Sequence, residues 1–413
     1  MLDLFAACVV VTALLAYLNH RFVGLPTTIG VMAAALVFTL GLVGLNALGL
    51  AHSLHEYEKA FLQSIRFSDV VLQGMLSLLL FASALHVDLS KLSTYRWPVA
   101  ALASIGTMLS TLAVGYGMWF TLPLTGLELP LLYCLIFGAL ISPTDPIAVI
   151  AILKSVGVPK ELELVISGES LFNDGIGVVL FSLLLGMLHS GHAPTPEQGV
   201  LLLLREVGGG LLYGIALGYV TFYLLKSVDN YQVEVLLTLA TVTGGYALAN
   251  KLHVSGPLAM VVAGLIIGNF GRALAMSDTT RRYVDTFWEL IDELLNAMLF
   301  TLIGMEALFL VYSISEFAVA AAAAIAVTLA ARLVTVGVPV RLLQRFFKLP
   351  HGSWKVLTWG GLRGGISVAL ALTLPLGPER DTVVAVTYWV VVFSILVQGL
   401  SLGRVTRNAV ASG

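Results

Sequence analysis

Two short polar stretches interrupt segments that otherwise read as membrane-spanning helix, and both carry carboxylates. One has the sequence Gly168-Glu-Ser-Leu-Phe-Asn-Asp174, and the other has Ser142-Pro-Thr-Asp-Pro146. A carboxylate at the centre of a membrane helix costs roughly 3 kcal/mol on insertion scales. Such residues usually face a bundle interior or a wet cavity and mark an ion or proton path. Together the two stretches therefore predict a buried cation site.

Several oxygen-bearing groups of these stretches can surround one point. Ser170 and Asp174 are four residues apart and share a helix face, while Asn173 lies about 100° around the helix from Asp174. The two prolines of the earlier stretch break the helix and free carbonyl groups at Thr144 and Asp145. This oxygen-only ligand set suits a small, hard cation such as Na⁺ or Li⁺ and lacks the soft ligands of a transition metal. We therefore expect no cofactor, only the transported ions.

A carboxylate isolated from water and from fixed cations can be neutralised by a proton or by a metal cation. Competition between the two produces exchange if the site faces each side of the membrane in turn. Our hypothesis is that Asp174 is the shared carboxylate and that Asp145 supports it.

Glu169 lies about 140° around the helix from Asp174 and so points elsewhere. A buried carboxylate needs a partner. Of the 22 Lys and Arg residues, only Arg332 and Arg363 lie well inside apolar segments. Arg363, in the glycine-rich run 360–365, is the predicted partner, and Arg332 is the alternative. The pair would be structural and would leave Asp174 without a fixed cation.

The composition requires a membrane protein. Of the 413 residues, 58% are hydrophobic and only 11% are charged, against about 25% charged in soluble domains. The apolar runs are continuous and do not alternate, which favours helices over a transmembrane β-barrel. The formal net charge of −2 comes with no basic face for nucleic acid, so the expected partners are the lipid bilayer and monovalent cations.

At about 20 apolar residues per span, the chain has about thirteen predicted membrane spans. Their approximate limits are 2–19, 26–50, 69–87, 97–120, 129–153, 162–188, 200–225, 231–250, 257–270, 284–310, 314–341, 353–375 and 381–404. Most loop Lys and Arg residues follow odd-numbered spans, which predicts an outside N-terminus and a cytoplasmic C-terminus. We expect an integral protein of a bacterial or archaeal plasma membrane, with an interfacial helix within 51–68.

The two polar breaks occupy matching places in the chain. Thirteen spans permit two repeats of six helices joined by one linking helix. The second repeat is then inverted in the membrane relative to the first. The fifth span of the first half holds the 142–146 break, and the fifth span of the second half holds the glycines of 360–365. Matched discontinuous helices are typical of inverted-repeat transporters with a midplane site. The predicted fold is therefore two inverted six-helix repeats whose broken helices, spans five and twelve, cross.

Other polar groups allow more than one interpretation. Span ten carries an acidic stripe at helical spacing, formed by Asp285, Glu289, Asp292, Glu293 and Asn296. It is either a membrane-entry turn facing Arg281 and Arg282 or a funnel that concentrates cations. The histidine groups at 52–55 and 189–192 have too few ligands for a closed metal site and are expected to be solvated.

With the motif Trp359-Gly-Gly-Leu-Arg-Gly-Gly365, these stretches resemble the NhaP-type sodium/proton antiporters and the eukaryotic sodium/proton exchangers. The resemblance implies an elevator-like homodimer. Unlike the eukaryotic exchangers, this chain is expected to have no cytoplasmic regulatory domain. Its ion-binding core bundle would comprise 97–188 and 314–404, its dimerisation bundle 1–87 and 231–310, and its linking helix 200–225.

The resemblance also implies residue roles. Asp174 would be the essential carboxylate that binds the ion and the proton. Its neighbours would be Asn173, Ser170, Asp145 and the Thr144 carbonyl. Glu169 and Arg363 would form a structural ion pair, with Arg332 as a second core arginine. An Asn-Asp pair, as at 173–174, goes with electroneutral one-for-one exchange.

The expected function is therefore exchange of Na⁺ or Li⁺ for H⁺, without enzymatic chemistry. A potassium/proton antiporter of the same fold is the nearest alternative, because sequence does not reveal the radius of an oxygen cage. A gated cation channel would need a symmetric ring of filter carbonyls, and no such loop repeat is visible. An intramembrane aspartyl protease would not explain Glu169, Arg363 or the matched breaks.

Overall fold

The computed structural model describes residues 2–47, 74–146, 149–150, 152–153, 158, 160–190, 196–311, 314–344, 346 and 349–411. Regular structure within these ranges is helical throughout, as predicted. Nine described segments are long and apolar enough to cross a membrane. Two shorter apolar helices, α5 (Leu76–Leu85) and α9 (Leu131–Ile141), fall in the ranges predicted for spans three and five. The whole stretch 51–68, which holds the predicted interfacial helix, and the histidines at 52, 55 and 192 lie outside the described residues.

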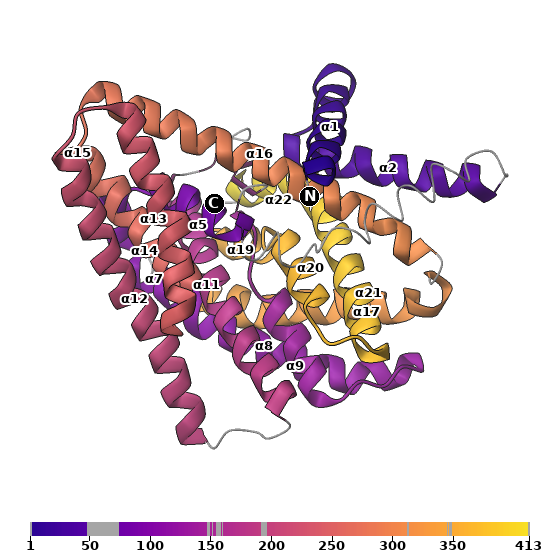
Figure 1. Cartoon of the computed structure of the whole chain (residues 1–413). Coiled ribbons are helices and arrows are strands. Elements are labelled where there is room, and N and C mark those ends of the chain that lie inside the picture. The colour runs from indigo at the N-terminus through magenta and orange to yellow at the C-terminus, as the bar shows by residue number, and fades with distance from the viewer. Residues whose placement is uncertain are drawn as a thin grey trace.

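One group of helices packs around α14 and α16. Its members are α1 (Leu2–Leu18), α2 (Thr27–Ala47), α5, α12 (Pro196–Lys226), α13 (Tyr231–Leu252), α14 (Gly256–Ile266), α15 (Arg272–Leu274) and α16 (Asp278–Val311). Helices α12, α13 and α14 contact one another, and α14 also contacts α5. Figure 1 shows the long α16 running from the α12–α15 side of the molecule to α1 and α2, which it contacts.

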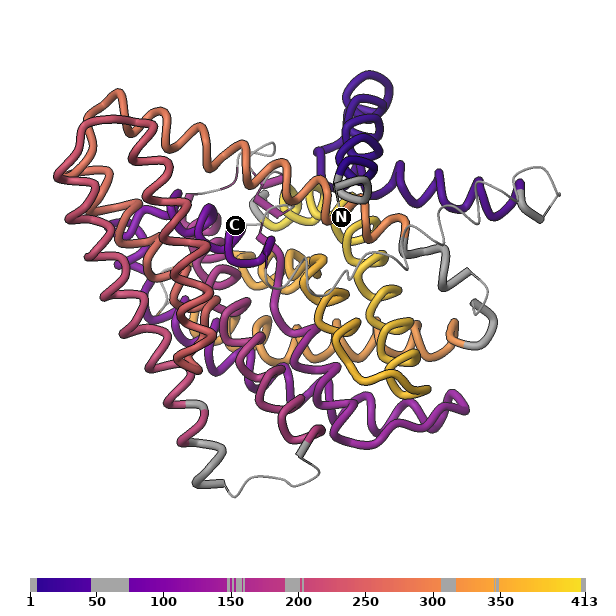
Figure 2. Tube along the Cα trace, in the orientation of Figure 1, coloured from indigo at the N-terminus to yellow at the C-terminus, as the bar shows by residue number. Residues whose placement is uncertain are grey.

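A second group surrounds the two interrupted helices. Its members are α6 (Leu89–Leu92), α7 (Arg96–Ala101), α8 (Thr107–Thr121), α9, α11 (Lys160–Ser190), α17 (Ile314–Arg332), α18 (Val338–Leu343), α19 (Ser353–Trp359), α20 (Gly365–Leu372), α21 (Pro378–Phe393) and α22 (Leu400–Ala411). Helix α9 contacts α8, α11 and α20, and α17 contacts α8 and α21. The trace in Figure 2 shows α20 and α21, in gold to yellow, beside the purple α9, which both of them contact.

Short polar turns decide where several helices begin. Asn230 accepts backbone hydrogen bonds from Gln232 and Val233, at 3.0 and 3.3 Å, and so caps α13. Ser255 caps α14 in the same way, with the Leu258 N–H donating to its hydroxyl at 3.3 Å. These side chains satisfy donors that a helix start leaves unpaired. Short connections therefore join α12 to α13, through residues 227–230, and α13 to α14, through residues 253–255.

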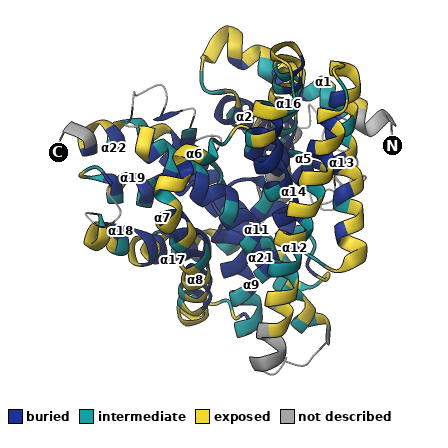
Figure 3. Cartoon of the chain, turned by 90° about the vertical axis from the view of Figure 1, so that its left-hand side faces the viewer, coloured by how far each residue is buried: buried dark blue, intermediate teal, exposed yellow. Residues whose placement is uncertain are grey.

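Exposed apolar side chains cover the outside of the molecule. Figure 3 shows buried residues concentrated in the centre and exposed residues along the outer helices. On α12, Leu204, Leu212 and Tyr223 are 64%, 71% and 67% exposed. Such surface is unfavourable in water but matches lipid tails, while each helix satisfies its own backbone donors and acceptors. The chain is therefore an integral membrane protein.

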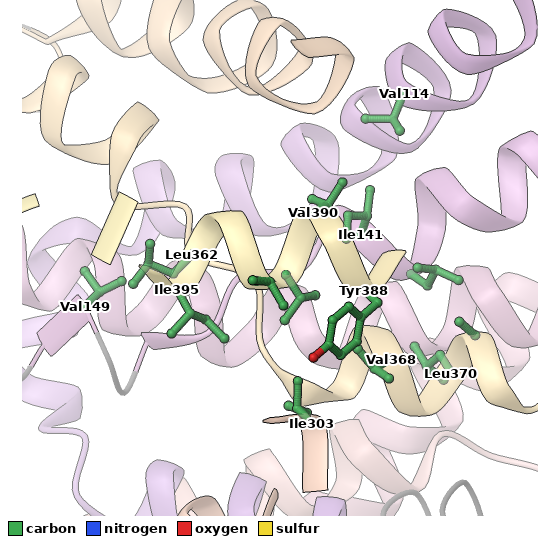
Figure 4. Packing of buried hydrophobic residues seen from close by; sticks show 14 of the residues in the cluster. Val114, Ile141, Val149, Ile303, Leu362, Val368, Leu370, Tyr388, Val390 and Ile395 are labelled. Carbon is green, nitrogen blue, oxygen red and sulfur yellow. The ribbon is translucent and has the colours of Figure 1, made fainter. Parts of the chain in front are cut away.

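The larger hydrophobic cluster encloses the two interruptions. Figure 4 shows Leu362 near Ile395 and Val149, with Val368 and Tyr388 in the same packed region. A second cluster fills the space between α5, α13, α14 and the first half of α16. Close packing of this kind fixes side-chain positions, so the broken segments are held in a defined place.

Candidate cation-binding site

The two predicted interruptions are present and lie against each other. Helix α9 ends at Ile141, and the next four residues are not helical. Helix α19 ends at Trp359, and α20 begins only at Gly365. The backbone N–H of Asp145 donates to the Leu362 carbonyl at 2.8 Å, so a donor freed by one break is satisfied at the other.

Gly364 allows the two breaks to approach this closely. A Cβ atom built at this position would lie 2.6 Å from Asp145 Oδ2 and 2.9 Å from Asp145 Cβ. Atoms of the site-forming carboxylate therefore occupy the space that any larger residue would need.

We expect Gly364→Ala to lower Na⁺-dependent proton exchange by roughly tenfold, because the added methyl group must displace the Asp145 side chain or separate the two breaks. Fluorescence-detected gel filtration would monitor folding beside the vesicle assay. Gly41→Ala is the matched control, since a Cβ there meets no atom within 4 Å. Equal exchange by the two variants would show that the close approach is unimportant.

A buried clamp joins the first break to α11. The Thr144 N–H donates to Asn173 Oδ1 at 3.2 Å, and Asn173 Nδ2 donates to Thr144 Oγ1 at 2.9 Å. The hydroxyl groups of Thr144 and Ser170 lie 2.9 Å apart and share a further hydrogen bond. Both ends of the Asn173 amide are thus engaged. The residue holds the broken segment in place, in contrast to the expectation that its amide faces the cation.

Asp174 is the acidic group of this site that is left without a fixed partner. Its side chain is buried, the residue being 7% exposed, and it makes no hydrogen bond or ion pair with the described residues. It lines a cavity together with Asp145, Leu79 and Leu80 of α5, and Asn296 and Leu299 of α16. The cavity therefore lies where the two groups of helices meet.

The predicted Glu169–Arg363 ion pair is wrong, because Glu169 pairs with Arg332. Arg332 Nη1 and Nη2 donate to Glu169 Oε1 and Oε2 at 2.6 and 3.0 Å. Both residues are buried, at 1% and 5% exposed. Arg363 instead donates through Nη1 to the carbonyls of Ser142 and Pro143, at 2.6 and 2.8 Å. Pro146 has no backbone N–H to donate to the Ser142 carbonyl, and the Arg363 guanidinium donates to this carbonyl and its neighbour instead.

Each core arginine thus occupies the carboxyl end of an interrupted helix. Arg363 binds carbonyls after α9, while Arg332 also donates to the Leu357 carbonyl in α19, at 3.3 and 3.2 Å from Nε and Nη2. Terminal carbonyls carry the negative end of the helix dipole, which cations stabilise. The sequence placed both arginines well inside apolar segments, but it did not indicate that they bind these carbonyl groups.

The acidic stripe of α16 runs from the surface to the cavity. Asp285 pairs with Arg272 at 2.5 Å, not with the arginines at 281 and 282. Glu289 and Glu293 are exposed, Asp292 is half-buried, and Asn296 at the far end is buried and lines the cavity. Within the described residues, no group of three His, Cys, Asp or Glu side chains is arranged to bind a metal ion.

Comparisons with known proteins show which family the sequence matches. A family model for the transmembrane sodium/hydrogen exchanger matches residues 10–408. The Na⁺/H⁺ antiporter NhaP of Pseudomonas aeruginosa is 55% identical over 416 residues, covering 100% of this chain and 97% of its own. NhaH of Halobacillus aidingensis, also a Na⁺/H⁺ antiporter, is 36% identical over 381 residues, covering 89% and 90%.

A solved structure shares the fold. The sodium proton antiporter MjNhaP1 from Methanocaldococcus jannaschii superimposes with a TM-score of 0.75 at 19% sequence identity, covering 98% of this chain and 97% of its own. At that identity the likeness concerns the fold alone.

Proposed function

Because this chain belongs to the sodium/hydrogen exchanger family, we propose that it exchanges Na⁺ or Li⁺ for H⁺ across the membrane. Family membership makes it a membrane transporter, not an enzyme. We assign the exchange to Asp174, which binds H⁺ and the alkali cation alternately.

The observation that carries this proposal is the unpaired Asp174 carboxylate in a buried cavity. Asp145 repels its negative charge and Arg363 attracts it. Since the guanidinium of Arg363 donates to backbone carbonyls, it does not occupy the carboxylate itself. Either a proton or a small cation can then neutralise Asp174, and each must leave before the other binds. Asp145 is the second carboxylate of the site. We assign the Ser170 hydroxyl and the Thr144 carbonyl as further oxygen ligands, because their chain neighbours at 143, 145 and 171 line the cavity.

The two helix groups give this site a way to face each side of the membrane. We propose that the group around the breaks, approximately 97–188 and 314–404, moves against the group formed by 1–87 and 231–310. Helix α12, which packs on α13 and α14, links the two moving parts in the chain, and the part formed by 1–87 and 231–310 mediates homodimerisation. Such motion is elevator-like alternating access, and the crossed breaks belong to two inverted repeats.

One-for-one exchange follows from using a single shared carboxylate. Neutralising Asp174 with H⁺ or with Na⁺ gives the moving group the same net charge. The loaded forms therefore cross the membrane electric field at equal cost, and the exchange is electroneutral.

Sealed vesicles containing the purified protein test this function. With an imposed pH difference, Na⁺, Li⁺ and K⁺ are added in turn while internal pH is followed. We expect Na⁺ and Li⁺ to move protons and K⁺ to have little effect. Proton movement driven by K⁺ alone would favour the potassium/proton antiporter, and voltage-driven cation flux without protons would favour a channel.

A further inference from the structure

We propose that Asn296 of α16 supplies an additional oxygen ligand to the cation bound at Asp174, and that Asp292 positions it. This inference rests on the proposed function and extends its site to the helix group that does not carry Asp174.

Asn296 has an unused acceptor at the cavity. The residue is only 3% exposed, yet it lines the cavity that contains Asp145 and Asp174. Its Nδ2 donates to the Asp292 carbonyl at 2.8 Å and to Asp292 Oδ1 at 3.2 Å. Its Oδ1 accepts no hydrogen bond from the described residues. The amide oxygen of this buried residue is therefore free to bind a cation in the cavity that the residue lines.

Asp292 determines which end of the amide faces the cavity. A carboxylate and a carbonyl only accept hydrogen bonds, so they require the NH₂ end of Asn296. With Nδ2 held by both acceptors of Asp292, the carbonyl end of the amide is on the free side. Asp292 lies one helical turn before Asn296 on α16, and Asn296 lines the cavity together with Asp145 and Asp174, which places this pair beside the cation site.

The chemistry of the amide oxygen suits the proposed substrate. Sodium and lithium are hard cations that prefer oxygen, and a neutral oxygen adds affinity without adding charge. Because this ligand is neutral, one Na⁺ still exchanges for one proton at Asp174. A transition metal would gain little from this ligand.

The position of α16 makes this ligand depend on the state of the transporter. One turn beyond Asn296, Leu299 packs so closely on Gly365 that a Cβ there would collide with it. Helix α16 thus contacts the start of α20, but it belongs to the other helix group. If the groups slide past each other, Asp174 moves away from Asn296. The full ligand set is then available in one orientation only, and the affinity for Na⁺ differs between the two sides.

The experiment measures the Na⁺ concentration for half-maximal proton movement in vesicles, together with ²²Na⁺ binding to the purified protein. We expect Asn296→Ala to raise the half-saturating Na⁺ concentration about tenfold, because one oxygen contact to a charged ion is about as strong as a hydrogen bond to a charged group. The maximal rate should stay within about twofold of the wild type. Asn296→Asp retains an oxygen and is expected to bind Na⁺ more tightly than Asn296→Ala.

Thr301→Ala is the matched control. Thr301 is buried on the same helix, and its hydroxyl donates to the Ala297 carbonyl at 2.8 Å without lining the cavity. It should keep wild-type affinity. The inference would be overturned if Asn296→Ala kept the wild-type affinity for Na⁺, or if Asn296→Ala and Asn296→Asp lost the same amount of affinity. In either case, Na⁺/H⁺ exchange by the wild type would still support the proposed function. Absence of Na⁺/H⁺ exchange in the wild type would overturn both.

Discussion

Asp174→Asn is expected to abolish Na⁺-dependent proton movement, by at least about a hundredfold, while leaving the folded protein intact. Asparagine has nearly the same shape but cannot bind and release a proton, and it carries no charge to attract Na⁺. Because Asp174 makes no hydrogen bond or ion pair with the described residues, its replacement breaks no stabilising contact. The vesicle assay and gel filtration measure the two properties separately.

Asp381→Asn provides the control for this result. The Asp381 side chain is 70% exposed, and its contact with Arg380, at 3.5 Å, is a surface one. Exchange by this variant should match the wild type. Exchange above about one tenth of wild type in Asp174→Asn would show that another group carries the proton.

Arg332→Met is expected to have the largest effect on stability. It would leave the Glu169 carboxylate buried without its cation and the Leu357 carbonyl without its donor. Breaking a buried pair by removing one partner costs about 3–5 kcal/mol. We expect a lower yield of folded protein and a lower unfolding temperature in detergent, measured by fluorescence-detected thermal unfolding.

A double-mutant cycle decides between the two arginines. Glu169→Gln combined with Arg332→Met should be less destabilised than the sum of the single variants, by about 1–3 kcal/mol, because both partners of the pair are then neutral. The same cycle with Arg363→Met should show clearly weaker coupling, since Arg363 hydrogen-bonds to the α9 carbonyls instead. Stronger coupling of Glu169 to Arg363 would contradict the observed pairing.

Features that depend on local composition were predictable from the sequence. Continuous apolar runs predicted a helical membrane protein. Paired prolines at 143 and 146 and clustered glycines at 360–365 predicted both breaks, because proline removes a backbone donor and glycine weakens a helix interior. The separation of Glu169 from Asp174 around α11 also follows from helix geometry alone.

Partners across the fold were not predictable in this way. Helical spacing indicates the face on which Glu169 lies, but not which of two buried arginines reaches it. Which arginine pairs with Glu169 depends on the carbonyls of Ser142 and Pro143, which accept hydrogen bonds from Arg363. That contact exists only in the tertiary structure, where the two helix breaks lie together. The double hydrogen bond between Asn173 and Thr144 likewise requires the tertiary placement of the first break on α11.

Proton release on Na⁺ binding is the most direct measurement of the shared carboxylate. Purified protein in weakly buffered detergent, at a pH where Asp174 is protonated, is titrated with Na⁺ while bound ²²Na⁺ and released protons are both counted. We predict close to one proton per Na⁺ in the wild type and none in Asp174→Asn. Saturable Na⁺ binding to the wild type without any proton release would contradict the account.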